Sequence, residues 1–173
     1  MDESGFMLQP VVRRTWAPRG ETPILRVWDR HDRLSVIDAI TLAPHRRRIG
    51  LYWQVHPANI RGPHVVGFLR HLRRRVRRKI VLIWDRGNCH RGRPVHDYLQ
   101  RHATRIRVEW LPPYAPELNP GEQVWNHAKY SDLANFVARD TPDLHAHVDA
   151  SLRDQRTQSR LLRSFFRTAK LRL

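Results

Sequence analysis

Two acidic residues lie at the ends of predicted elements, one after a strand and one in the first turn of a helix, where carboxylates can do chemistry. Asp85 comes after the apolar, β-branched run 79–84, which is typical of a buried strand. Glu122 is the third residue of a predicted helix, with Asn119 as N-cap and Pro120 at the first position. Carboxylates that converge in a basic surround suit Mg²⁺, which assists phosphoryl transfer. Each acid also has an explanation without chemistry: Asp85 as a turn residue, Glu122 as part of a capping box.

The charge of the chain favours a polyanionic partner. Its 173 residues carry 32 Lys and Arg against 16 Asp and Glu, a formal net charge of +16. Such an excess favours nucleic acid as the partner, although an Arg-rich lineage would produce it without one. Hydrophobic residues make up 40% of the chain, which excludes a disordered basic tail and indicates one domain with a core.

The cysteine count and the hydropathy indicate the compartment. Cys89 is the only cysteine, so no internal disulfide can form. No window approaches the ~18 apolar residues of a membrane helix, and the start lacks a signal pattern. We therefore expect a cytoplasmic, nucleoid-associated protein with no membrane partner. Zinc is not favoured, because Cys89, His90, His96 and His102 do not have the spacing of a compact four-ligand site.

Strands and helices are predicted to alternate after an antiparallel start, which indicates an α/β fold with a mixed sheet flanked by helices. In such sheets ligands gather at the carboxyl ends of strands, where Asp85 lies. The helix that begins after Asn119 is expected to run to about Phe136, and one long helix or two should follow Asp140. The predicted strands are 24–28, 34–42, 49–55, 79–85 and 106–111, and the helices before Asn119 are 63–76 and 94–102.

Basic and aromatic residues in two segments suit contact with a DNA backbone. One is the Pro- and Gly-rich stretch 10–23, which could equally be a surface loop whose Trp16 caps the core. The other is the outer face of the helix that begins at Pro63. The predicted DNA-contacting residues, including a histidine five positions after Asp85, are Arg13, Arg14, Trp16, Arg19, Arg73, Arg74, Arg77, Arg78 and His90.

The stretch LPPYAPELNPGEQVW, residues 111–125, resembles a known family. Together with Asp85 and His90, it is similar to the second half of the catalytic domain of DDE-type insertion-sequence transposases. The branch is the insertion sequence six-thirty family, bacterial relatives of the mariner elements. The start, DESGF, and the later RTWAPRGETP, residues 14–23, resemble the first catalytic segment of that family. The resemblance covers nearly the whole chain.

The resemblance implies a ribonuclease-H-like fold with a mixed five-stranded sheet. It implies that Asp2, Asp85 and Glu122 bind two Mg²⁺ or Mn²⁺ ions, cut transposon-end phosphodiesters and transfer the 3′-hydroxyl to target DNA. The implied partners are transposon terminal repeats, target DNA and a second copy of the chain in a homodimer. Residues 1–140 would be the catalytic domain, and 141–173 a basic helical segment packed on it or extending from it.

The sequence departs from the family pattern before Asp2. In the family a strand and a helix-turn-helix region precede the first Asp, and this sequence has neither. We therefore expect a truncated first strand and a loosely placed Asp2, with Asp38 as a candidate substitute and Glu3 as a neighbour of the site. Two alternatives remain open: an inactive DNA-binding fragment, and a ribonuclease-H-like nuclease that only hydrolyses.

Overall fold

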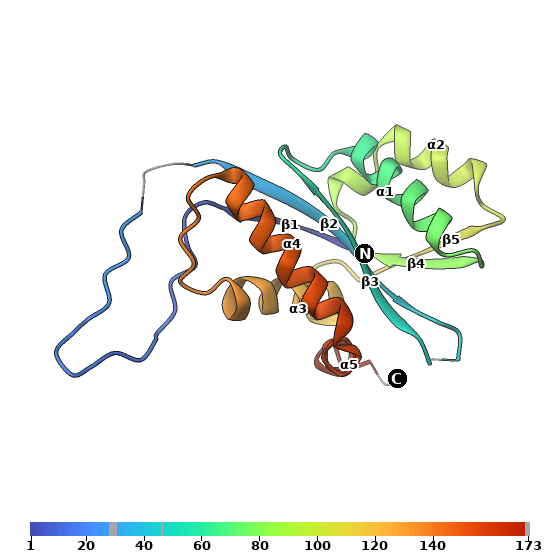
Figure 1. The fold of residues 1–173 in the computed structure, drawn as a ribbon. Helices are drawn as coiled ribbons and strands as arrows, with labels where there is room; N and C mark the ends of the chain where they lie inside the picture. Colours follow the sequence, from blue (N-terminus) through green and yellow to red (C-terminus); the bar gives the residue numbers. More distant parts are fainter. Residues whose placement is uncertain (28–30, 46, 172–173) are drawn as a thin grey trace.

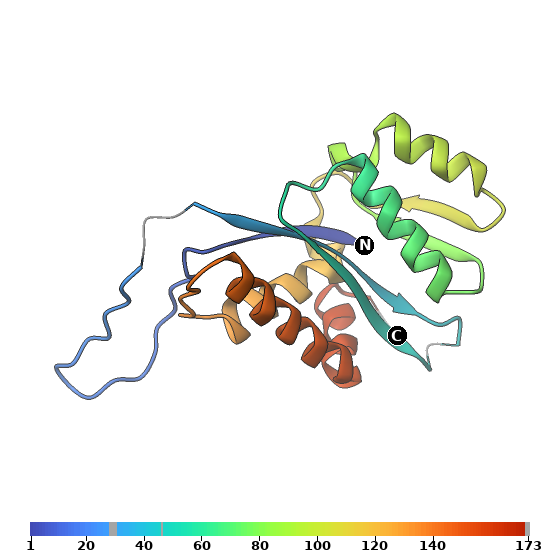
Figure 2. The ribbon, with the colours of Figure 1, turned by 45° about the horizontal axis from the view of Figure 1, so that its top comes forward.

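The structure is a computed structural model that describes residues 1–27, 31–45 and 47–171. Its described strands fall into two sheets that lie end to end (Figures 1 and 2). The first sheet contains β1 (Asp2–Met7), β2 (Arg33–Leu42) and β3 (Ile49–His56), and the second contains β4 (Ile80–Trp84) and β5 (Ile106–Trp110).

The first sheet is antiparallel. All six residues of β1 pair with β2, so that Asp2 lies opposite Asp38 and Phe6 opposite Leu34. Side chains alternate between the two faces of a strand, and directly opposite residues share a face. Asp2, Ser4 and Phe6 therefore point to one side of the sheet and Glu3 to the other.

The second sheet is parallel and lies against two helices. α1 (Gly62–Arg75) leads into β4, and α2 (Arg93–Arg101) connects β4 to β5. A one-turn 3₁₀ helix, η1 (Asn88–His90), follows β4. The apolar side chains of α1, including the fully buried Phe68, pack with Trp84 of β4 into one core.

Three helices cover the face of the antiparallel sheet that lies away from α1, as Figures 1 and 2 show. They are α3 (Pro120–His127), α4 (Thr141–Thr157) and α5 (Ser159–Thr168). Leu152 of α4 and Leu162 of α5 are fully buried against β1, β2 and α3 in a second core. Residues 141–168 thus share a core with the strands. None of the helices in the described ranges combines the length and apolar character needed to cross a bilayer.

The five strands are arranged differently from a single mixed sheet. In the described residues the strands form two separate hydrogen-bonded sheets, and at their junction the Met1 amino group donates to the Ile83 carbonyl at 3.0 Å. β1 begins at Asp2, and the residue before it, Met1, contacts β4. Packing still joins the sheets, because Met1 and Ile37 of the first contact the core of the second.

Two sequence predictions need correction, and one alternative that the sequence left open is decided. No strand covers residues 24–27: they form an extended segment with Ile24 81% exposed, and the last position of the predicted strand lies outside the described residues. The α-helical turns of α3 end at His127, and a π-helical turn (Ala128–Asp132) continues the chain. The C-terminal segment is two helices, α4 and α5, that meet at Gln158.

Candidate active site

Asp2 is firmly held, so the expectation of a loose Asp2 is wrong. It is the first residue of β1, and only 6% of it is exposed. The indole Nε1 of Trp125 donates a hydrogen bond to Asp2 Oδ2 at 3.0 Å. Gly121 of α3 lies so close that a Cβ atom there would stand 2.8 Å from Asp2 Cβ.

Glu122 and Asp85 come from two other elements, α3 and the turn after β4. Asn119 caps α3 as predicted, since its Oδ1 accepts from the amide of Gly121 at 3.0 Å. This tight start of the helix against β1 brings Glu122 beside Asp2. Asp85 follows β4, its side chain is 53% exposed, and its Oδ1 accepts from the Gly87 amide at 2.9 Å.

The charge of Glu122 acts on Asp2, and the charge of Asp85 acts on Glu122. Burial, aided by the charge of Glu122, raises the pKa of Asp2 from 3.8 to about 7. Burial also raises the pKa of Glu122, and the charge of Asp85 adds to that rise while Lys129 opposes it. Glu122 therefore stands near enough to each of the other two carboxylates that the sequence singled out for their charges to interact.

Lys129 belongs to the site and was missed in the sequence. Its Nζ donates to Ser4 Oγ at 2.7 Å and lies 5.2 Å from the ring centre of Phe6. Burial lowers the pKa of Lys129, and the charges of Glu122 and Asp2 oppose that fall. The spacing offered a signal, because residues seven apart share a helix face and Lys129 comes seven after Glu122.

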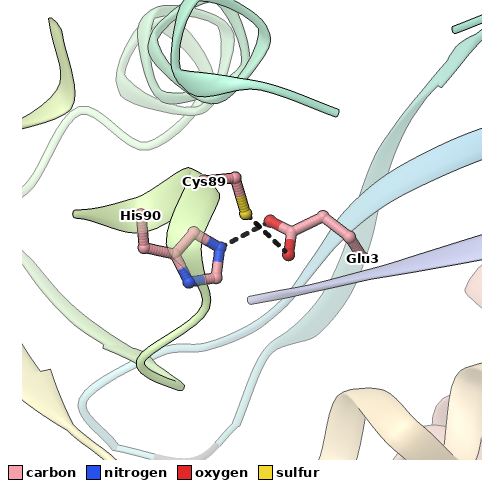
Figure 3. Close-up of side chains that lie close together, drawn as sticks. All are labelled: Glu3, Cys89 and His90. Carbon is pink, nitrogen blue, oxygen red and sulfur yellow. Dashed lines mark hydrogen bonds and ion pairs between the residues drawn. The ribbon is translucent and has the colours of Figure 1, made fainter. Parts of the chain in front are cut away.

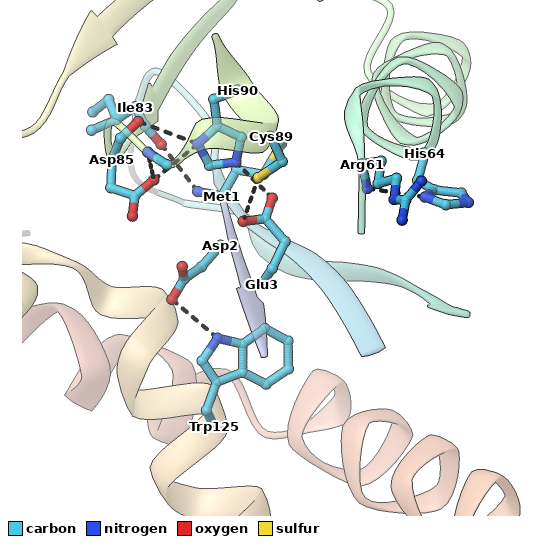
Figure 4. A network of polar contacts seen from close by, with 11 residues as sticks. Met1, Asp2, Glu3, Arg61, His64, Ile83, Asp85, Cys89, His90 and Trp125 are labelled. Carbon is cyan, nitrogen blue, oxygen red and sulfur yellow. Dashed lines mark hydrogen bonds and ion pairs between the residues drawn. The ribbon is translucent and has the colours of Figure 1, made fainter. Parts of the chain in front are cut away.

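A second network stands behind the acids, on the other face of β1. Glu3 points toward Cys89 and His90 of η1 (Figure 3). His90 Nε2 lies 2.7 Å from Glu3 Oε1, and His90 Nδ1 lies 2.9 Å from Asp85 Oδ1. The His90 ring stacks on Trp84, with centroids 4.3 Å apart. Figure 4 shows how this network links the strand carrying Asp2 to the turn carrying Asp85.

These contacts correct the predicted role of His90. His90 is only 2% exposed, so its ring is not available for the DNA contact that the sequence suggested. Burial lowers the pKa of His90, but hydrogen bonding to Cys89 and Glu3 outweighs this and raises it to about 10. The imidazolium can therefore donate to Glu3 and Asp85 at once and fix the orientation of Asp85.

Asp38 is a buried neighbour of Asp2 rather than its replacement. It is fully buried, and neither carboxyl oxygen has a hydrogen-bond partner among the described residues. Burial raises the pKa of Asp38 well above its ordinary value. Asp2, by contrast, accepts the hydrogen bond of the Trp125 indole.

The predicted DNA-contacting residues lie in two places. The arginines from Arg73 to Arg78 stand at the end of α1 and before β4, whereas Asp85 follows the far end of β4. A five-residue strand spans about 16 Å, so this cluster is well separated from the acids. Arg14, Trp16 and Arg19 lie exposed in the long segment that leaves the body between β1 and β2 (Figure 1).

Two further residues mark the surroundings. The amide of Arg13 donates to Asn135 Oδ1 at 2.8 Å, and its guanidinium lies 5.6 Å from the ring centre of Tyr130. The extended segment is thus anchored at its first arginine. Tyr114, in the loop before α3, is fully exposed and has a φ of 53°, a left-handed conformation that is costly for any residue except glycine.

Comparison with known proteins gives a family and a fold. A family model described as DDE superfamily endonuclease matches residues 1–145. The Mos1 transposase paired-end complex with left transposon end shares 14% identity at a TM-score of 0.64, covering 98% of this chain and 50% of that one. The Mos1 mariner paired-end complex with Mn has the same values, and a pre-cleavage Mos1 transpososome gives 12% identity, a TM-score of 0.59, and coverage of 99% and 55%.

The chain thus spans about half the length of these solved proteins. No curated protein matches the sequence. At such low identity the structural likeness shows the fold, which confirms the predicted ribonuclease-H-like α/β class. The family model covers most of the chain, including Asp2, Asp85 and Glu122. The chain therefore belongs to the DDE superfamily endonucleases.

Proposed function

We propose that this chain is the catalytic domain of a transposase of a bacterial insertion sequence. It would cut the phosphodiesters at transposon ends and join the freed 3′-hydroxyl to target DNA. The observation that supports this most directly is the position of Glu122 of α3, whose charge interacts with Asp2 of β1 and with Asp85 at the end of β4. The similar Mos1 structure contains a transposon end, which agrees with DNA as the substrate class.

The three carboxylates suit divalent cations. Burial raises the pKa of Asp2 and of Glu122, and the neighbouring carboxylate adds to each rise, so a cation beside them would relieve the repulsion. We propose Asp2, Asp85 and Glu122 as the ligands of two Mg²⁺ or Mn²⁺ ions. Such ions supply an activated water and stabilise charge on the phosphoryl oxygens.

The surrounding side chains orient these ligands. The Trp125 indole holds Asp2 Oδ2, and the His90 imidazolium holds Asp85 Oδ1. Lys129 places a positive charge beside Glu122 and limits the repulsion among the acids. These fixed contacts favour the sub-ångström positioning that a metal-dependent site needs.

The exposed segment between β1 and β2 suits both DNA and a second copy of the chain. It presents Arg14 and Arg19 together with Trp16, which is fully exposed, and Val12 and Ile24, which are 72% and 81% exposed. Apolar side chains so exposed favour burial against a partner. We therefore propose a homodimer on DNA, in the cytoplasm at the nucleoid.

In this proposal, residues 1–140 form the catalytic domain and 141–173 a basic helical segment packed on it. The basic residues at the end of α1 would contact DNA away from the cut site. They are Arg73, Arg74, Arg77 and Arg78.

Nicking and joining assays test the proposal. With Mg²⁺ or Mn²⁺ the chain should nick DNA bearing its transposon ends, and Glu122→Gln should abolish nicking. Asp97→Asn, a change at an acid of α2 remote from the three ligands, is the matched control and should retain activity. No nicking by folded protein with either metal would contradict the proposal.

Two readouts separate the alternatives. A labelled 3′-hydroxyl end that is never joined to a second duplex would indicate a nuclease that only hydrolyses. DNA affinity that falls steeply with salt, without any cleavage, would indicate a DNA-binding fragment.

A further inference from the structure

A second group of potential metal ligands lies on the opposite face of β1 from Asp2. Glu3, Cys89 and His90 each offer one ligand atom, and these atoms all lie within 4.8 Å of one another (Figure 3). Cys89 Sγ is 3.7 Å from Glu3 Oε2, and His90 Nε2 is 2.7 Å from Glu3 Oε1. The group joins residues that are 86 and 87 positions apart in the sequence.

The donor types differ from those of the three catalytic acids. Thiolate and imidazole favour Zn²⁺ over Mg²⁺, which prefers oxygen ligands. Zn–S and Zn–O bonds of about 2.3 and 2.0 Å in tetrahedral geometry place the sulfur and oxygen about 3.5 Å apart. The separation of 3.7 Å between Cys89 Sγ and Glu3 Oε2 is close to that, and His90 Nε2, which lies 2.7 Å from the other oxygen of Glu3, needs to move away by about half an ångström.

The other nitrogen of His90 already has the environment typical of a zinc ligand. Metal-binding histidines generally donate their second ring N–H to a carboxylate or a backbone carbonyl. His90 Nδ1 lies 2.9 Å from Asp85 Oδ1 and 3.2 Å from the Asp85 carbonyl. This leaves Nε2 as the metal-facing atom, and it points at Glu3 (Figure 4).

The site is also built to hold positive charge. His90 is buried, and two carboxylates contact its ring, so the surroundings stabilise a cation between Glu3 and Asp85. A metal ion would take the place of the proton on Nε2 and of the thiol proton of Cys89. It would keep the Nδ1–H bond to Asp85.

We propose that Glu3, Cys89 and His90 form a zinc site that is distinct from the catalytic acids. Bound Zn²⁺ ties β1 to η1 beside the junction of the two sheets, where one hydrogen bond from Met1 crosses to Ile83. Its effect is structural: it holds the strand of Asp2 and the turn of Asp85 together. The site does not depend on the proposed DNA cleavage, because folding and binding of the metal are measured without DNA.

Spectroscopy with Co²⁺ in place of Zn²⁺ tests the site directly. When Co²⁺ is added to the reduced, metal-free chain, a thiolate-to-Co²⁺ charge-transfer band should appear, and Zn²⁺ added afterwards should remove it. Cys89→Ser, a nearly isosteric change, should abolish the band, and Glu3→Gln should weaken Co²⁺ binding at least ~10-fold. Glu122→Gln removes a catalytic acid and should leave the band intact.

Thermal unfolding provides the second measurement. Zn²⁺ should raise the Tm of the wild type and of His96→Ala, a change at an exposed histidine of α2, but not that of Cys89→Ser. Folded wild-type chain without a thiolate band would overturn the proposal. Equal stabilisation of Cys89→Ser and wild type by Zn²⁺ would overturn it as well.

Discussion

Replacing Gly121 by alanine should separate the two elements that carry Asp2 and Glu122. The new methyl carbon would stand 2.8 Å from Asp2 Cβ and 3.1 Å from Asn119 Oδ1. Carbon atoms normally pack at about 3.5–4.0 Å, so β1 and α3 must move apart by about 1 Å. Neither Asp2 Cβ nor the new methyl carbon can rotate away, because Asp2 lies in a paired strand and residue 121 lies in the first turn of a helix.

The magnitude follows from two opposing effects. Alanine in a helix is favoured over glycine by up to about 1 kcal/mol. Overpacking of a closed contact costs about 1–3 kcal/mol. We expect Gly121→Ala to lower the free energy of unfolding by up to about 2 kcal/mol. A displacement of about 1 Å in a site that tolerates roughly 0.5 Å should slow Mg²⁺-dependent nicking about 100-fold.

Gly67→Ala is the matched control. Gly67 lies within α1, and a Cβ atom there would meet nothing within 4 Å. This variant should gain up to about 1 kcal/mol of stability in urea unfolding and nick DNA like the wild type. The reasoning fails if Gly121→Ala is stabilised as Gly67→Ala is, or if it nicks at the wild-type rate.

Three other predictions concern charge, backbone and core. The pKa of Asp2 is raised from 3.8 to about 7, so the contribution of Asp2 to the free energy of unfolding is fully present below about pH 4 and is lost as the pH rises through about 7. Asp2→Asn removes the ionisable group. It should stabilise the metal-free chain by up to about 4 kcal/mol at about pH 8 and by little below about pH 4. Urea unfolding with a chelator measures this, and a difference that does not vary with pH would contradict it. Tyr114→Gly should stabilise the chain, because glycine adopts the left-handed backbone conformation of this position without strain. If the exposed Tyr114 ring stacks on a base, the same change should weaken DNA binding by about 1–3 kcal/mol. Fluorescence anisotropy of labelled DNA measures this, and unchanged affinity would exclude the stacking. Leu162→Ala should cost about 2–5 kcal/mol in a single unfolding transition, because α5 shares a core with the strands; a second, separate transition would show that the C-terminal helices fold on their own.

The sequence located Asp85 and Glu122 because each is marked by a local signal. A β-branched run predicts the strand before Asp85, and Asn119 and Pro120 predict the start of the helix that carries Glu122. In the structure, β4 lies within a residue of its predicted bounds and α3 begins at Pro120 as predicted, although α3 ends at His127 rather than near Phe136. Signals of this kind are legible in one sequence because they act over a single turn of chain.

Contacts between distant residues were not predictable in the same way. The Trp125–Asp2 bond spans 123 positions, and the Glu3–His90 pair spans 87. No local pattern encodes such a pairing, which is why Asp2 was expected to be loose and His90 to face DNA. The predicted strand near Ile24 failed for a related reason, because a strand-like composition forms a strand only where a partner strand is available.

The alternation of β1 makes its pairing register decisive. Asp2 and Glu3 are adjacent acids with equal charge, yet one faces Trp125 and the other His90. A slip of one residue along β2 would exchange them and would also move Phe6 out of the core in favour of Met7, which is now 48% exposed. The fit of Phe6 in the core thus selects which of the two acids belongs to the catalytic group, and net charge alone cannot.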